Sequence, residues 1–244
     1  DSIDGKNVFP TWRATAAYNF VETGTKLRAS AGTGAKAPSL YQRFSIYGTP
    51  GLQPEHNFGY DAGIDQSLLN GRVKLSLTAF DTRYRNLFDF DPLGNNFVGA
   101  YINVGRARIS GLEASADAIL VPEEWRLRAS YTRLRAVDET RHILLLRRPR
   151  DTASLSATYT GITNLEVEGR VTFVGKRIDI LNDFPYSRVP MAPYGKVDVR
   201  ASYKVNEKLS VFARAENLSN ARYQEIRDYG TAGRSFYAGI QVTW

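Results

Sequence analysis

The side chains that could do chemistry are few and scattered in this sequence of 244 residues. Its two histidines, His56 and His142, have no recognisable partner motif, which disfavours hydrolytic Ser/His or Asp/His catalysis. Asp89, Asp91 and the pair Asn95-Asn96 offer oxygen atoms of the kind that hard cations bind, but Asp and Asn are also turn residues. We therefore predict no enzyme, no metal site and no cofactor.

A basic cluster, Arg147-Arg148-Pro149-Arg150, is the densest group of cations in the chain. Guanidinium groups bind carboxylates and phosphates through paired hydrogen bonds. The cluster is therefore a candidate contact for anionic groups of a ligand or for the phosphates of lipopolysaccharide. The alternative is a solvated rim with no ligand.

The net charge of +7 does not indicate a nucleic-acid partner. In the segment 196–205, Lys196, Asp198, Arg200 and Lys204 alternate with small and apolar residues, so acids and bases share one face of a strand. Glu113, Asp117, Glu168, Arg170 and Arg214 fit the same pattern elsewhere. Mixed charges on one face are typical of a hydrated lumen and of structural hydrogen bonds.

The last twelve residues show most clearly which kind of element carries these charges. Phe236, Ala238, Ile240, Val242 and Trp244 alternate with polar or small residues, which predicts a strand between an apolar and a polar medium. No run of about 18 or more apolar residues occurs, so no membrane-spanning helix is expected. A terminal strand that ends on an aromatic residue resembles the closing strand of outer-membrane β-barrels.

Similar patterns predict eleven strands and hence an all-β, antiparallel transmembrane barrel. Short turns, among them Asn70-Gly71, alternate with long connections, as in barrels with periplasmic turns and extracellular loops. The predicted strands are 10–21, 25–35, 57–69, 72–90, 97–120, 125–137, 150–160, 165–180, 194–205, 208–218 and 233–244.

The odd number of strands carries a structural consequence. Bacterial single-chain barrels close with an even number, and an open sheet edge cannot face lipid. Eleven strands therefore predict part of a barrel, and half of a 22-stranded transporter fits that number. The alternative is one miscounted strand and a closed barrel of ten or twelve.

Several motifs resemble those of TonB-dependent outer-membrane receptors. They are 35–41 (AKAPSLY), 52–55 (LQPE), 103–113 (NVGRARISGLE), 216–223 (ENLSNARY) and 229–234 (YGTAGR). The resemblance covers nearly the whole chain and implies that residues 1–244 form the C-terminal portion of the barrel. The plug domain and the N-terminal barrel strands of that family would then lie outside this sequence.

Within that family, 105–111, 145–148 (LLRR) and 229–234 are most similar to the cobalamin (vitamin B12) receptors. The resemblance implies that Arg147 and Tyr229 contact the ligand from extracellular loops. It also leaves siderophore and haem receptors as alternatives, because these share the scaffold. Arg147 and Tyr229 are the two predicted ligand-binding residues.

The resemblance further implies active transport energised by the TonB complex, which pulls on a plug inside the barrel. The expected location is the bacterial outer membrane, in contact with lipid and lipopolysaccharide, as a monomer when the barrel is complete. A passive porin is the main alternative of another class, and it would conduct large steady ion currents.

Overall fold

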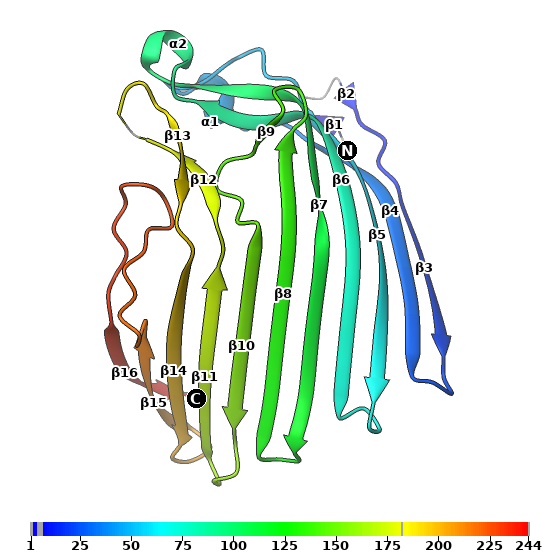
Figure 1. Cartoon of the computed structure of the whole chain (residues 1–244), viewed down its shortest axis with the longest axis vertical. Coiled ribbons are helices and arrows are strands. Elements are labelled where there is room, and N and C mark those ends of the chain that lie inside the picture. Colours follow the sequence, from blue (N-terminus) through cyan, green and yellow to red (C-terminus); the bar gives the residue numbers. More distant parts are fainter. Residues whose placement is uncertain (1, 4–6, 182, 244) are drawn as a thin grey trace.

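The structure is a computed structural model that describes residues 2–3, 7–181 and 183–243. Eleven strands follow one another in chain order in one curved antiparallel sheet (Figure 1). A two-residue strand, β9 (Ile143–Leu144), pairs with β8 as a twelfth. The eleven are β3 (Arg13–Phe20), β4 (Thr25–Lys36), β5 (Glu55–Leu68), β6 (Val73–Asp91), β7 (Ala100–Val121), β8 (Trp125–Asp138), β10 (Asp151–Tyr159), β11 (Leu165–Val174), β14 (Tyr194–Lys204), β15 (Leu209–Glu216) and β16 (Ser235–Val242).

The smaller elements gather at the end of the sheet that carries the long connections, at the top of Figure 1. They are β1 (Ser2–Ile3), β2 (Asn7–Val8), α1 (Leu40–Phe44), α2 (Gly94–Phe97) and the hairpin β12 (Arg177–Ile180) with β13 (Arg188–Met191). Ser39 and Gln42 form a capping box that starts α1. Short turns join the strands at the other end, so the predicted alternation of loop lengths is confirmed.

All eleven predicted strands are present, most with bounds within a few residues of the prediction, and the segment 165–180 differs most. The segment 165–180 divides at Gly175, where a Cβ atom would lie 2.8 Å from the carbonyl oxygen of Asp151. Beyond Gly175 the chain leaves the sheet and pairs with β13 as β12. The Asn70-Gly71 turn has positive φ at both residues, 54° and 84°, but Leu69 shares this conformation, so the loop is longer than a two-residue hairpin turn. Trp244, predicted to end the last strand, lies outside the described residues.

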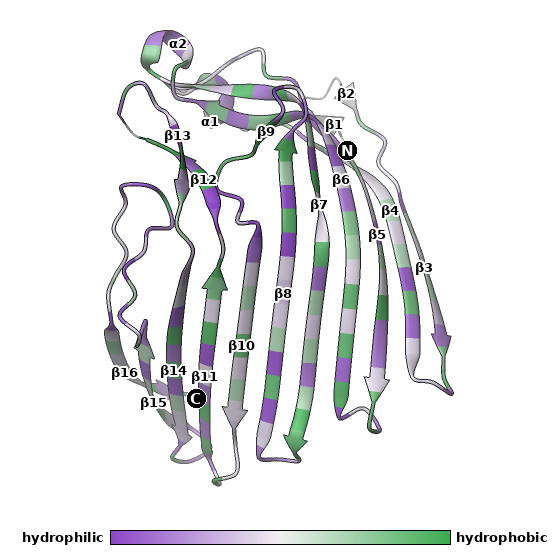
Figure 2. Ribbon diagram, in the orientation of Figure 1, coloured by the Kyte–Doolittle hydropathy of each residue, from purple (hydrophilic) through white to green (hydrophobic). Residues whose placement is uncertain are grey.

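The sheet has an apolar and a polar face over most of its height, and the strands alternate accordingly in Figure 2. One row of cross-strand partners runs through Leu27, Ile64, Leu77, Ala114, Tyr131, Ala153 and Phe173. A row on the other face runs through Lys74, Asp117, Arg128, Ser156, Arg170 and Asp198. Directly paired residues project to the same side of a sheet. We call the first side the lipid face and the second the lumen face.

A small buried cluster lies at the loop end of β7 and β8. It contains Val104, Ala107 and Ala136, and Leu145 of the segment after β9 covers it. Ala107 and Ala136 are in phase with Asp117 and Arg128, on the lumen face. The segment 145–150 therefore folds inward over the lumen face.

The ends of the sheet agree with the predicted fold class. Among the described residues, β3 and β16 form its two edges, and each pairs with a strand on one side only. Eleven long antiparallel strands with a lipid face and a lumen face form part of a barrel wall, as the sequence predicted. None of the helices in the described part of the chain has the length and apolarity to cross a membrane.

Candidate ligand-binding site at the loop end of the sheet

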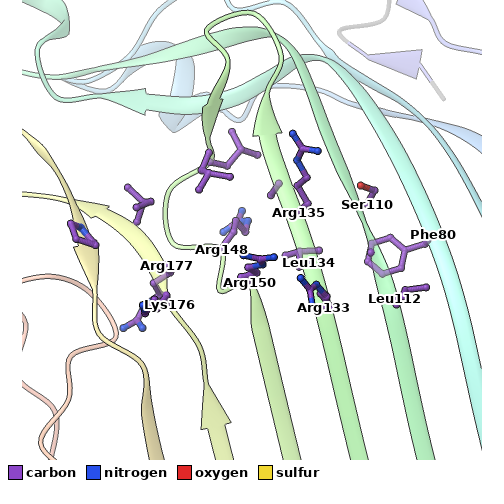
Figure 3. Close-up of a pocket in the computed structure, with 16 residues that line it drawn as sticks. Phe80, Ser110, Leu112, Arg133, Leu134, Arg135, Arg148, Arg150, Lys176 and Arg177 are labelled. Carbon is purple, nitrogen blue, oxygen red and sulfur yellow. The ribbon is translucent and has the colours of Figure 1, made fainter.

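A hollow of about 850 Å³ lies at the loop end of β6 to β8 (Figure 3). Phe80 and Leu134 line it from the sheet, Leu145 from the inward-folded segment, and Ile178 and Pro190 from the β12–β13 hairpin. Gly111 leaves the space open, because a Cβ atom there would lie 2.1 Å from the carbonyl oxygen of Arg133 and 2.9 Å from the Phe80 ring. The fold thus builds a partly apolar hollow from three separate regions of the chain.

The charged groups of this hollow are all basic. Arg148, Arg150, Lys176 and Arg177 line it from the loop segments, and no Asp or Glu of the described residues contributes to it. Arg133 and Arg135 border it from β8, but the strand register directs their side chains to the lipid face. Figure 3 shows Arg148 and Arg150 close together near the centre, with Lys176 and Arg177 on the hairpin side. The side chains of Arg148, Arg150 and Lys176 are exposed. Such a site favours an anion that also presents apolar surface.

Asp179 holds together the loops around the hollow. Its side chain is 0% exposed, and its carboxylate accepts hydrogen bonds from Arg147 Nε at 2.8 Å, the Arg227 amide at 2.8 Å and the Ile180 amide at 2.9 Å. Burial raises the pKa of Asp179, but these hydrogen bonds, that from the Arg227 amide first, outweigh it and hold the pKa below its ordinary value. A charged Asp179 therefore ties the segment 145–150 and the loop 217–234 to the β12–β13 hairpin.

Arg177 makes a second connection between the hairpin and the loop 217–234. It is buried and donates hydrogen bonds to the carbonyl oxygens of Gln224 and Glu225. Its guanidinium group lies 5.5 Å from the centre of the Tyr194 ring, which stacks on Tyr223 at 4.1 Å. Arg177 thus has a structural role, whereas the exposed Arg148, Arg150 and Lys176 are available for a ligand.

The two predicted ligand residues occupy different environments. Arg147 has positive φ (57°), and its guanidinium group is held by Asp179, although 43% of the side chain stays exposed. Tyr229 is 63% exposed on the loop 217–234, two residues after the Arg227 amide that also binds Asp179. Asp179 therefore brings the two segments together, with Tyr229 facing solvent and Arg147 in an ion pair.

The other groups considered for chemistry have structural environments. Asn95 and Asn96 adopt left-handed turn conformations in α2, and Asp91 Oδ1 accepts the Leu93 amide, as predicted for a turn. No cluster of three or more metal-ligating side chains occurs among the residues that the structure describes. His56 lies in β5, with its ring 4.9 Å from that of Phe9.

The predicted pairing of charges on the lumen face is confirmed. Asp117 accepts hydrogen bonds from Arg126 Nη2 at 2.6 Å and Arg128 Nε at 3.2 Å. Glu168 pairs with Arg170 at 2.9 Å, and Glu216 with Arg214 at 3.4 Å. Asp179 and Lys176 were not among the residues predicted from the sequence. One signal in the sequence could have indicated a buried ion pair: in Lys176-Arg177-Ile178-Asp179-Ile180 a single acid lies between two isoleucines, after two basic residues.

A curved antiparallel wall with an apolar face and a charged lumen face defines part of an outer-membrane β-barrel. The sequence profile of the family described as "TonB dependent receptor-like, beta-barrel" matches residues 1–218. The chain belongs to this family. Its location is the outer membrane of Gram-negative bacteria.

Solved structures with the same fold include receptors for iron chelates and a copper transporter. The pyoverdine receptor FpvA of Pseudomonas aeruginosa PAO1 has 23% identity and a TM-score of 0.72, over 94% of this chain and 35% of the receptor. The ferric enterobactin receptor PfeA of P. aeruginosa has 19% identity and a TM-score of 0.76, over 96% and 40%. The copper transporter OprC has 16% identity and a TM-score of 0.77, over 95% and 39%. The chain thus spans about two fifths or less of the length of these structures, and at such identities they define its fold alone.

Proposed function

We propose that this chain forms part of the barrel wall and the ligand-facing loops of a receptor that takes up a large anionic metal chelate of the siderophore class. The observation that carries the proposal is the hollow at the loop end, in which Arg148, Arg150 and Lys176 are exposed beside apolar side chains and none of the described acids takes part. Solved structures of the same fold that bind pyoverdine and enterobactin support this ligand class. The plug and the remaining strands would be supplied by other parts of the receptor.

The residues of the hollow would act by binding and orientation, with no covalent change of the ligand. Guanidinium groups donate paired, charge-assisted hydrogen bonds to carboxylate or catecholate oxygens. Leu134, Ile178 and Pro190 would cover the organic part of the chelate. Asp179 would keep the loops in place while the ligand binds, and the TonB-energised plug would then let it pass.

Cobalamin is the second candidate ligand. The motif resemblance assigns ligand contact to Tyr229, and this side chain is 63% exposed on the loop that adjoins the Asp179 connection. Arg147→Ala and Tyr229→Ala should each weaken binding by roughly 1–3 kcal/mol if a polar partner loses its hydrogen bond. Because Arg147→Ala also breaks the pair with Asp179, Tyr229→Phe is the cleaner probe of a contact through the hydroxyl group.

Calorimetry on the full-length receptor that contains this chain, with ferric enterobactin, ferric pyoverdine and cyanocobalamin, tests the proposal. Saturable binding of a ferric chelate is expected, and Arg148→Glu/Arg150→Glu should weaken it by roughly tenfold or more. Lys208→Glu, at a short turn of the opposite rim, is the matched control and should leave binding unchanged. Binding of cyanocobalamin alone would overturn the siderophore reading, and large steady currents in planar bilayers would contradict a gated receptor.

A further inference from the structure

The lipid face changes its chemistry abruptly at the loop end of β6, β7 and β8. On β8, Trp125, Leu127, Ala129 and Tyr131 are followed on the same face by arginines. The outward positions there are mostly polar: Arg133 and Arg135 on β8, Ser110 and Arg108 on β7, and Asp81 and Arg83 on β6, with Leu112 and Val137 as apolar exceptions. We call the six arginines of this region the outer arginine patch: Arg83, Arg85, Arg106, Arg108, Arg133 and Arg135.

The strand register assigns these six side chains to the lipid face. Arg83 pairs directly with Phe58 of β5 and with Arg108 of β7. The Phe58 ring lies 6.2 Å from the rings of both Trp12 and Tyr60, which belong to the aromatic rim of the apolar band. The patch therefore adjoins this rim on the membrane side of the wall, away from the hollow described above.

The height of the patch matches the membrane surface. Arg135 lies about ten residues after Trp125, which belongs to the lower aromatic rim with Tyr159 at 4.8 Å. A rise of roughly 3.3 Å per residue and a strand tilt of about 40° place Arg135 roughly 25 Å above Trp125. The apolar band of such barrels is about 25 Å tall. The patch is thus at the level of the headgroups of the outer leaflet.

The patch carries an excess of positive charge that the sheet itself would disfavour. Arg83 faces Arg108, and Arg85 faces Arg106, in two cross-strand pairs of like charge. Asp81, whose carboxylate is 7% exposed, lies 2.5 Å from Arg108 and 3.6 Å from Arg83 and holds this pair in place. Six arginines stand against three acids on this face, Asp81, Glu139 and Asp151, so three positive charges remain to be neutralised.

A hollow of about 280 Å³ opens within the patch. Arg108, Ser110, Arg135 and His142 line it, together with Val137 and Glu139. Two guanidinium groups and a hydroxyl group in one hollow suit a phosphate group, whose oxygens accept paired hydrogen bonds. The apolar rows directly below would accommodate acyl chains of the same lipid.

We propose that the outer arginine patch binds the phosphate groups of a phosphorylated glycolipid of the outer leaflet. We infer the class of ligand from the position of the patch, because a molecule bound there needs an anionic head at the membrane surface and apolar chains below it. Binding would neutralise the two arginine pairs and fix the height of the wall in the membrane. This site is separate from the proposed siderophore site, which lies on the lumen face.

Native mass spectrometry of the full-length receptor in detergent, with bisphosphorylated lipid A as the probe, tests the proposal. We expect lipid A retention to fall by roughly tenfold or more in the variant Arg85→Gln/Arg106→Gln/Arg133→Gln/Arg135→Gln. Arg148→Gln/Arg150→Gln is the control on the lumen face and should retain it fully. Lipid A without phosphate should bind weakly to the unmodified receptor, and inorganic phosphate should not displace the bisphosphorylated lipid.

Three results would overturn the proposal. They are equal retention by the patch variant and the unmodified receptor, an equal loss in the lumen control, and equal binding of lipid A without phosphate. If the fourfold variant does not fold, as judged by heat-modifiable migration, Arg133→Gln/Arg135→Gln takes its place. This pair makes no contact with Asp81, so its removal leaves the anchored arginines intact.

Discussion

Asp179→Asn should loosen the loops around the hollow without unfolding the sheet. The carboxylate is fully buried and accepts three hydrogen bonds, from Arg147, Arg227 and Ile180. Asparagine keeps the shape, but it loses the charge and turns an amide NH2 toward one of these donors. Breaking a buried ion pair costs about 3–5 kcal/mol. Since 43% of the Arg147 side chain reaches solvent, we expect the lower part of this range or less, about 2–3 kcal/mol.

Hydrogen–deuterium exchange of the full-length receptor measures this effect directly. A loss of about 2–3 kcal/mol in the closing equilibrium of the loops corresponds to roughly 30-fold to 150-fold faster exchange. The increase should appear in peptides that cover 145–150 and 221–234, whose backbone or side chains bind Asp179. Peptides from β5 should exchange as before, because no residue of that strand contacts Asp179 among the described contacts.

Asp183→Asn is the matched control, since this acid is exposed in the same hairpin connection. Unchanged exchange at 145–150 and 221–234 in Asp179→Asn would refute the reasoning. The same increase in Asp183→Asn would also refute it, because the effect would then come from net charge and not from the buried hydrogen bonds.

Three further predictions concern charge and packing. Hydrogen bonds hold the pKa of Asp179 below its unfolded value, so its contribution to stability is complete above about pH 4 and is lost as the pH falls through the folded-state pKa. The difference in thermal midpoint between the unmodified receptor and Asp179→Asn should therefore be constant above about pH 5 and should shrink as the pH falls below about 4. Gly111→Ala should destabilise the barrel by about 1–3 kcal/mol in denaturant titrations, because the added Cβ atom would meet the backbone of Arg133. Gly169→Ala is the control and should be neutral or slightly stabilising, because no atom lies within 4 Å of the Cβ position there. Asp117→Asn should cost about 1 kcal/mol in the same titration, since its partners Arg126 and Arg128 are about half exposed, and a loss above about 3 kcal/mol would contradict this view of the lumen charges.

The long strands were predictable because a membrane and a lumen impose opposite chemistry on alternate residues. The eleven segments show this period of two in the sequence, and each is a strand in the structure. The loop elements have no such constraint. The hairpin of β12 and β13 pairs through residues such as Ile178 and Pro190, whose partners cannot be read from periodicity. Helix α1 was missed although its capping box, Ser39 to Gln42, was visible in the sequence.

The candidate site was predictable only in part, because loop folding decides which charges remain exposed. The cluster at 147–150 was identified as basic, but its members have different roles. Arg147 turns to Asp179, which is distant in sequence, whereas Arg148 and Arg150 line the hollow. Only the tertiary fold brings Lys176 beside them, since it lies beyond the break at Gly175.

The two faces of the wall use arginine differently. On the lumen face, arginines toward the turn end are paired with an acid on the neighbouring strand, as Arg126 and Arg128 are with Asp117, and this arrangement leaves little net charge. At the loop end both faces carry unbalanced arginines, in the hollow on the lumen side and in the patch around Arg108 and Arg135 on the lipid side. Unbalanced charge disfavours the isolated sheet, and in our two proposals an anion from outside the chain neutralises each group. Because the wall separates the two groups, the soluble ligand and the membrane lipid can neutralise them independently, and removing either anion should leave the binding of the other unchanged.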